Sequence, residues 1–268
     1  MIFDTHAHYD DPRYDGDRDE VLNNLATHGV GRVVDICAAF RDLEKILSLA
    51  ERYPFVYAAV GVHPSEVGGL NDEKIDCIRQ AAAHPKVVAI GEIGLDYHYD
   101  DGPSRDVQKT WFLKQLDVAK ETGLPVVIHS RDASKDTLDI MRKAHENGIT
   151  GVIHCFSGSV ETAEEYLKMG YFLGIGGVLT FKNSKTLRGV VRIAPIEQLV
   201  LETDCPYLAP EPHRGERNDS RLLPSVVSAL AQIKGMDEAE VIAVTEKNAC
   251  ALYRLKEPAT TPAGGRHV

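Results

Sequence analysis

The sequence lacks the features that mark secreted and membrane-spanning proteins. Its five cysteines among 268 residues are widely spaced and form no CxxC pair. An odd number at such spacing argues against a disulfide framework and favours a reducing compartment. The longest apolar stretches, such as residues 55–62, are too short to cross a bilayer. The first apolar segment already contains His6 and His8, which a cleavable leader would remove, so we expect a cytoplasmic protein.

Positive charge is also scarce. Thirty Lys and Arg residues stand against 40 Asp and Glu, for a formal net charge of −10. This balance counts against broad coating of nucleic acid, whose phosphates are usually met by a positive surface. It leaves room for a small basic rim around a metal-lined cleft, because bound metals add local positive charge. With 43% hydrophobic and 26% charged residues, the composition is that of a globular domain with an ample core.

Apolar segments rich in Val and Ile recur along the whole chain, and an amphipathic stretch follows many of them. They are nearly continuous rather than strictly alternating, which is typical of parallel strands covered on their outer face. The eight segments are residues 2–5, 32–36, 57–60, 87–90, 125–129, 151–154, 171–175 and 198–202. Helical spacing marks residues 42–53, 108–122, 161–169, 224–233 and 237–255.

Alternating βα units favour either a closed barrel or a doubly wound sheet. A doubly wound sheet most often carries a Gly-rich phosphate loop after its first strand, whereas this first strand carries Asp and His. We therefore predict an α/β protein with a single-domain (β/α)₈ TIM barrel over residues 1–255. Residues 256–268, rich in Pro, Thr and Gly, are expected to form a mobile tail without a catalytic role.

Side chains that can bind metal fall at the C-terminal ends of the predicted strands, where barrel enzymes keep their active sites. His6 and His8 are two residues apart, so strand geometry aims both at the barrel mouth. The others are Glu92 after the fourth strand, His129 and His154 at the ends of the fifth and sixth, and Glu202 and Asp204 at the end of the eighth. A single strand-end histidine is more often structural than a ligand, so the interpretation depends on the whole set.

Imidazole and carboxylate together bind Zn²⁺, Mn²⁺ or Mg²⁺, and an acidic residue can bridge two ions. Two ions about 3.5–4 Å apart would clamp the attacking and leaving oxygens of a phosphate ester. We interpret Glu92 as the bridge and Asp204 as a ligand that also orients or deprotonates the attacking water. His6 and His8 would hold one ion, whereas His129 and His154 would hold the other ion or the substrate; Glu202 is a further catalytic candidate.

Other residues near the proposed metal ligands give weaker indications of function. His63 ends the third strand and could bind phosphate or tune a ligand, although a structural role beside Pro64 is nearly as plausible. Arg131, His213 and Arg214 offer cationic or hydrogen-bonding groups near the mouth, and Arg suits bidentate phosphate recognition. The alternative for the arginine-containing run is an ordinary solvated loop.

In order, several motifs resemble the TatD family of metal-dependent deoxyribonucleases, which are amidohydrolase-like barrels. H-x-H alone occurs in many amidohydrolases, but the ordered combination is much more specific, and the resemblance extends to about residue 255. The matching pieces are residues 4–8, 61–64, 91–97, 125–131, 154–158, 202–210 and 212–215.

The resemblance implies a two-metal site that hydrolyses DNA phosphodiesters, typically from a 3′ end of a single strand. It implies a glutamate, not a carbamylated lysine, at the bridging position, where Glu92 stands. The implied ligands are His6, His8, Glu92, His129, His154 and Asp204. One departure is that Asn218 is followed by residues 219–221 where Glu-Pro is expected, which bears on substrate-strand contacts.

Three functions compete. The leading one is a DNase acting on single-stranded ends, with Tyr97, Tyr207 and Arg214 among the side chains that touch the strand. The second is a small-molecule amidohydrolase or lactonase, or a deacylase of mischarged tRNA, using the same ligands on a carbonyl. The third, a non-catalytic metal-binding protein, predicts a broken ligand set, whereas this set is complete. No membrane or obligate protein partner is expected.

Overall fold

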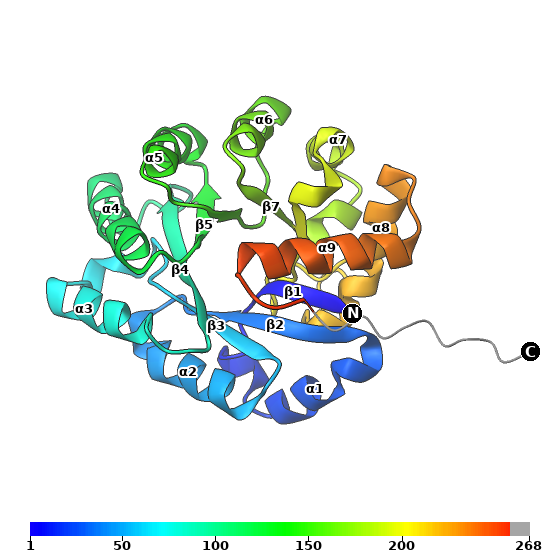
Figure 1. Cartoon of the computed structure of the whole chain (residues 1–268), viewed down its shortest axis with the longest axis horizontal. Coiled ribbons are helices and arrows are strands. Elements are labelled where there is room, and N and C mark those ends of the chain that lie inside the picture. Colours follow the sequence, from blue (N-terminus) through cyan, green and yellow to red (C-terminus); the bar gives the residue numbers. More distant parts are fainter. Residues whose placement is uncertain (258–268) are drawn as a thin grey trace, which may run out of the picture.

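In a computed structural model that describes residues 1–257, eight parallel strands form one sheet in sequence order (Figure 1). Every strand that the sequence predicts is present. The strands are β1 (Ile2–Ala7), β2 (Val30–Ile36), β3 (Val56–Val60), β4 (Val87–Asp96), β5 (Val126–Arg131), β6 (Gly151–Ile153), β7 (Phe172–Ile175) and β8 (Leu199–Leu201). Of the predicted tail, residues 258–268 lie outside the described part of the chain.

The two end strands of the sheet meet at a seam between β1 and the segment after β8. A parallel bridge joins Ala7 to Cys205, and the backbone N–H of His8 donates to Cys205 O at 2.8 Å. The N–H of Asp204 donates to His6 O at 2.9 Å. These bonds close the sheet and confirm the (β/α)₈ barrel.

Helices form a ring outside the strands, except for the last one, which crosses one end of the barrel (Figure 1). They are α1 (Arg18–Asn24), α2 (Leu43–Arg52), α3 (Asp72–Ala81), α4 (Arg105–Thr122), α5 (Ser134–Glu146), α6 (Val160–Lys168), α7 (Lys185–Ile193), α8 (Leu223–Lys234) and α9 (Glu238–Leu252). The five helices expected from the sequence are all found. Helix α4 is capped at its C-terminus by Gly123, whose φ of 69° is the left-handed conformation typical of such caps. None of the helices in residues 1–257 combines the length and apolar character of a membrane span.

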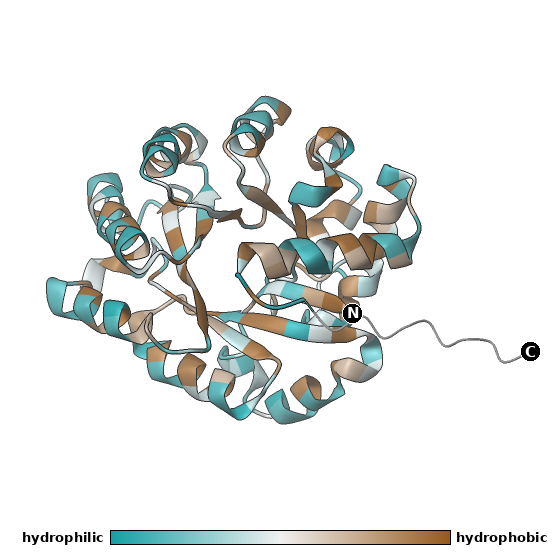
Figure 2. Cartoon of the chain, viewed as in Figure 1, coloured by the Kyte–Doolittle hydropathy of each residue, from teal (hydrophilic) through white to brown (hydrophobic). Residues whose placement is uncertain are grey.

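The apolar residues form two layers, and Figure 2 shows them on the strands and on the inner sides of the helices. The larger cluster lies between the sheet and the helix ring. The smaller one groups strand residues such as Phe3, Val34 and Val127 with the end of α9 around Tyr253. Helix α9 packs against β1 and β8 at this end, and the Tyr253 hydroxyl donates to Thr5 O at 2.8 Å. The strand-end histidines lie at the other end, the C-terminal mouth, together with Glu92 and Asp204.

Candidate metal centre

His6 and His8 face the same space, as their spacing of two predicts. His6 lies in β1 and His8 directly follows it, and their Nε2 atoms are 3.1 Å apart. The other ring nitrogen of His8, Nδ1, lies 2.9 Å from Ile36 O and donates to it when it carries the proton. Both rings are buried. Their Nε2 atoms therefore converge on one point at the mouth.

Glu92 stands between this histidine pair and a second one. Its Oε2 lies 3.6 Å from His6 Nε2 and 3.8 Å from His8 Nε2. Its Oε1 lies 2.8 Å from His129 Nδ1 and 2.8 Å from His154 Nε2. The two oxygens of one buried carboxylate thus face two histidine pairs, which is the arrangement expected of a bridging residue.

The expectation that Glu92 follows the fourth strand was wrong, because β4 continues to Asp96. The pairing of β4 with β5 shifts register between Ile90 and Ile93, so Glu92 lies at an irregularity inside the strand. Gly91 permits the close approach, because a Cβ there would lie 2.6 Å from the Cβ of Val127 on β5. This irregularity lets a mid-strand residue reach the centre of the mouth.

Asp204 completes the group around the first histidine pair. Its Oδ1 lies 3.4 Å from His8 Nε2 and 3.6 Å from His6 Nε2. Its φ is 55°, a left-handed conformation that Asp tolerates better than most residues. With the seam bond from its N–H to His6 O, this conformation brings the carboxylate to the mouth.

The donor set fits a pair of divalent ions. One group offers two imidazole nitrogens with oxygens of Glu92 and Asp204, and the other offers two imidazole nitrogens with the second oxygen of Glu92. In each of the trios His6–His8–Glu92 and Glu92–His129–His154, the ligand atoms lie within 4.8 Å of one another. Mixed nitrogen and oxygen sites of this kind bind Zn²⁺, Mn²⁺ or Mg²⁺.

The charges of the site keep its carboxylates ionised. Burial acts to raise the pKa of Glu92, but the nearby His154, His63 and His129 outweigh it and hold that pKa well below its usual value. Burial likewise opposes ionisation of Asp204, yet the hydrogen bond with His8 and the charges of His154 and His6 lower its pKa. Both residues can therefore serve as anionic ligands at neutral pH.

His63 lies at the edge of this centre. Its Nε2 is 3.8 Å from Glu92 Oε1, and its ring meets that of His129 edge-on with centroids 4.3 Å apart. Burial and the charge of His129 lower the pKa of His63 to about 4. It is therefore neutral at physiological pH and its free nitrogen can donate or accept a hydrogen bond.

Asp96 is a site residue that the sequence interpretation missed. Its Oδ2 lies 3.0 Å from Nε2 of His129, the nitrogen on the far side of the ring from Glu92. Gln108 holds Asp96 in place, because its Oε1 accepts from Asp96 N at 2.8 Å. The signal was the spacing of four between Glu92 and Asp96, which places both on one side of a strand once β4 is extended.

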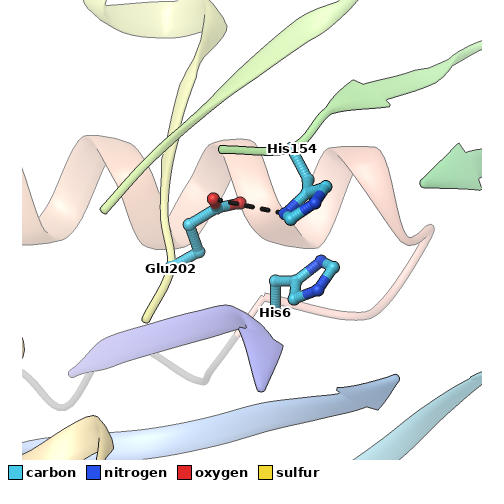
Figure 3. A group of neighbouring side chains, drawn as sticks. All are labelled: His6, His154 and Glu202. Carbon is cyan, nitrogen blue, oxygen red and sulfur yellow. Dashed lines mark ion pairs between the residues drawn. The ribbon is translucent and has the colours of Figure 1, made fainter. Parts of the chain in front are cut away.

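Glu202 lies beneath the histidines rather than at the mouth. Its side chain is 1% exposed, and its Oε1 accepts a hydrogen bond from Cys155 N at 2.6 Å. Figure 3 shows the rings of His6 and His154 stacked beside this carboxylate, with centroids 3.8 Å apart and planes 11° apart. The structure thus brings Glu202 into the cluster from the barrel interior.

The predicted substrate residues fall into two groups. Tyr207, Arg131 and Arg214 are exposed. Tyr97 is half-buried and its hydroxyl donates to Asp136 at 2.9 Å, whereas His213 lies 3.0 Å from Glu216. The first group is the more exposed of the two, although the Tyr207 hydroxyl also donates to Asp11 Oδ2, at 3.5 Å.

Tyr207 and Arg131 each take part in a pair of a guanidinium and an aromatic ring. Arg13 lies 4.1 Å from the ring centroid of Tyr207, and Arg131 lies 5.2 Å from that of Tyr99. Arg13 and Tyr99 were not predicted, since nothing in the sequence links them to the strand ends. Such pairs offer π faces to bases and positive charge to phosphates.

The loop after β8 is supported by Asn218 and by residues 219–221, where the sequence departs from the family pattern. Asn218 is buried and its amide donates to Thr203 O at 3.0 Å and to Tyr207 O at 2.7 Å. The Ser220 hydroxyl donates to Asp4 Oδ2 at 2.6 Å. These residues therefore hold the segment that carries Asp204, and the sequence change leaves that anchoring intact.

Comparisons with known proteins find similar sequences and a similar structure over nearly the whole chain. A family model described as TatD related DNase matches residues 3–254. The uncharacterized metal-dependent hydrolase YabD of Bacillus subtilis is 41% identical, over 95% of this chain and 100% of that protein. The 3′-5′ ssDNA/RNA exonuclease TatD of Cronobacter sakazakii is 34% identical, over 94% of this chain and 97% of that protein. The crystal structure of the Escherichia coli TatD homologue YjjV superposes with a TM-score of 0.90 at 32% identity. The match covers 95% of this chain and 98% of that one.

Proposed function

This chain belongs to the family of TatD-related DNases, and we propose that it is a 3′-5′ exonuclease acting on single-stranded DNA through two metal ions. It is a metal-dependent hydrolase of ester bonds, as its family is. The observation that carries the proposal is Glu92, whose two oxygens face two separate histidine pairs. The name of the Cronobacter relative, which includes single-stranded DNA and RNA, supports the choice of substrate.

His6, His8, Glu92 and Asp204 would hold one ion, and Glu92, His129 and His154 the other. Bound Mg²⁺, Mn²⁺ or Zn²⁺ would polarise a phosphoryl oxygen and make water a better nucleophile at neutral pH.

Asp204 is the proposed base. Its side chain is 19% exposed, against 5% for Glu92 and 11% for His8, so it faces the solvent more than they do. Because its lowered pKa keeps it ionised, it can orient the attacking water and accept its proton. His63, neutral and at the edge of the centre, is placed to hydrogen-bond a phosphate oxygen.

Single-stranded DNA ends are the proposed partner. Tyr207 would stack on a base, and Arg131 and Arg214 would meet phosphates, with Tyr97 and His213 as further contacts. We propose neither an obligate protein partner nor a membrane partner. All five cysteines lie in the described residues as free thiols, which supports our proposal of a cytoplasmic, reducing location.

One observation favours the second candidate, a hydrolase of small esters or amides or of aminoacyl-tRNA. A cavity of about 190 Å³ adjoins His154 and is lined by Ser130, Ser157 and Tyr166 among others. This volume suits a small acyl or ring-shaped group.

The test uses metal-stripped protein and single-stranded DNA labelled at the 5′ end or the 3′ end, with Mg²⁺, Mn²⁺ or Zn²⁺ restored separately. We expect a metal-dependent ladder from the 5′-labelled strand and immediate release of a labelled mononucleotide from the 3′-labelled one. Glu92→Ala and Asp204→Ala should abolish both, whereas Glu165→Ala on α6 should not.

Three results would contradict parts of this proposal. Wild-type activity in either site variant would refute the residue assignment. A metal-loaded protein that leaves DNA intact but cleaves an ester or lactone panel would establish the second candidate. Failure to bind any divalent ion would refute the metal centre itself.

A further inference from the structure

Each of the four histidines in the two ligand groups has a second ring nitrogen directed elsewhere. For two of them this nitrogen has a partner: His8 Nδ1 lies 2.9 Å from Ile36 O, and His129 Nε2 lies 3.0 Å from Asp96 Oδ2. Within the described residues, Nδ1 of His6 and Nδ1 of His154 have no hydrogen-bond partner, although both are buried. Buried polar atoms rarely stay unpaired, so these two call for an acceptor.

One carboxylate lies next to both rings. Glu202 enters from the end of β8, and its Oε1 is 3.6 Å from His154 Nδ1 (Figure 3). Ligand atoms of His6, His154 and Glu202 all lie within 4.8 Å of one another. Among the described residues, Oε2 of Glu202 is also without a partner. Two nitrogens and one carboxylate oxygen therefore share a buried space without a direct bond between them.

The surrounding residues are arranged for this carboxylate. A Cβ at Gly174 on β7 would overlap Oε2 of Glu202, so glycine leaves the room it occupies. Cys155 has a φ of 44°, and its N–H donates to Oε1 of Glu202 at 2.6 Å. The N–H of Cys155 thus holds the carboxylate beneath the rings, and the missing side chain at Gly174 leaves room for it there.

We propose that Glu202 accepts hydrogen bonds from Nδ1–H of both His6 and His154 and so fixes the tautomer and orientation of both rings. An imidazole that coordinates metal through Nε2 carries its proton on Nδ1, and an outer carboxylate that accepts this proton orients the ring. His6 belongs to one ligand group and His154 to the other. Glu202 is therefore a positioning residue shared by both ion positions, and this inference rests on the proposed metal centre.

A third cation between Glu202 and the two rings is chemically disfavoured. Each ring would have to coordinate through Nε2 and Nδ1 at once, which requires an imidazolate on both histidines. Accepting two N–H groups asks for no such deprotonation, so the hydrogen-bonded arrangement follows from the chemistry of neutral imidazole.

The first test measures metal binding by calorimetry, with stoichiometry from elemental analysis. In Glu202→Gln the affinity should fall at both ion positions by about 10–100-fold, the usual effect of losing an outer carboxylate. Asp96→Asn, which among the proposed ligand histidines contacts His129, should weaken one ion by a similar factor. Glu165→Gln, a change of the same kind at a half-buried residue on α6, should match the wild type at both positions.

The outcomes distinguish failure of the proposed function from failure of the role proposed for Glu202. If the wild type binds no divalent ion, the proposed function fails. If the wild type binds two ions and Glu202→Gln binds both unchanged, or loses only one, the shared role of Glu202 is refuted.

The second test needs no variant, so it holds even if Glu202→Gln does not fold. Long-range ¹H–¹⁵N spectra of histidine-labelled protein with Zn²⁺ should show Nδ1–H on His6 and His154 and metal-shifted Nε2 resonances. A proton on Nε2, metal at Nδ1 or a third equivalent of bound ion would overturn the proposal.

Discussion

Metal binding should strengthen as pH rises, because the ions have to displace protons from histidines. Burial lowers the pKa of His8, but the hydrogen bond and charge of Asp204, with the charge of Glu92, outweigh it and raise this pKa to about 10. For His154, the same opposition between burial and the charges of Glu92 and Glu202 raises the pKa well above its usual value. Each ion position therefore contains a histidine that is protonated at neutral pH when no metal is bound.

The cost follows from the distance between working pH and pKa. At pH 7, His8 is three pH units below its pKa of about 10. One unit corresponds to about 1.4 kcal/mol, so removing this proton costs metal binding about 4 kcal/mol. Between pH 6 and pH 8 the apparent affinity at the His6–His8 position should rise by roughly tenfold per unit from His8 alone.

Calorimetric titration with Zn²⁺ at pH 6, 7 and 8, in two buffers of different ionisation enthalpy, measures both the affinity and the protons released. We expect release of at least one proton for each ion at pH 7. In His8→Asn, one proton fewer should be released, and the pH dependence at that position should flatten. Equal affinity at pH 6 and pH 8 without proton release would refute the argument, because it would mean that the histidines are already neutral.

Two further changes test the substrate face and the seam. Tyr207→Ala should raise KM for single-stranded DNA by roughly 5–150-fold, since stacking on one aromatic ring contributes about 1–3 kcal/mol per base. Metal binding should stay unchanged, and Tyr207→Phe should behave like the wild type. An unchanged KM would show that the DNA strand does not bind at Tyr207. Asp4→Ala should lower the free energy of unfolding by about 2–4 kcal/mol in urea titrations, because its buried carboxylate accepts from Thr203 and Ser220 across the seam. A loss below 1 kcal/mol would show that the backbone bonds of the seam suffice.

The fold was predictable because strand and ligand signals coincide. Eight apolar segments mark the strands, and the polar residues that follow them all meet at one rim of a parallel barrel. His6 and His8 needed only the two-residue period of a strand to be placed together. Of the missed helices, α7 carries Leu187, Val190 and Val191 at helical spacing, so its signal was present in the sequence.

What could not be predicted depends on backbone irregularity and register. The apolar run of β4 stops near residue 90, yet the strand continues to Asp96. The partnership of Asp96 with His129 follows from the β4–β5 register, in which Gly94 pairs with His129. A strict strand period would make Glu202 and Asp204, which are two residues apart, face alike at the mouth. The left-handed φ of Asp204 breaks the strand period, so one carboxylate reaches the mouth and the other stays beneath the rings.

The two ligand groups differ in how they depend on the fold. Glu92, His129 and His154 lie on or directly after β4, β5 and β6, which pair side by side through local connections. The other group joins His6 and His8 to Asp204, across the seam between the first and last strands of the chain. It therefore exists only when the barrel is closed. The seam does not need the metal for this closure, because backbone bonds and the buried Asp4 join β1 to the segment after β8, and α9 packs on both strands. The protein can thus hold in place, before an ion arrives, the four donors His6, His8, Glu92 and Asp204. Metal binding therefore has to displace protons from histidines, but it does not have to order the side chains.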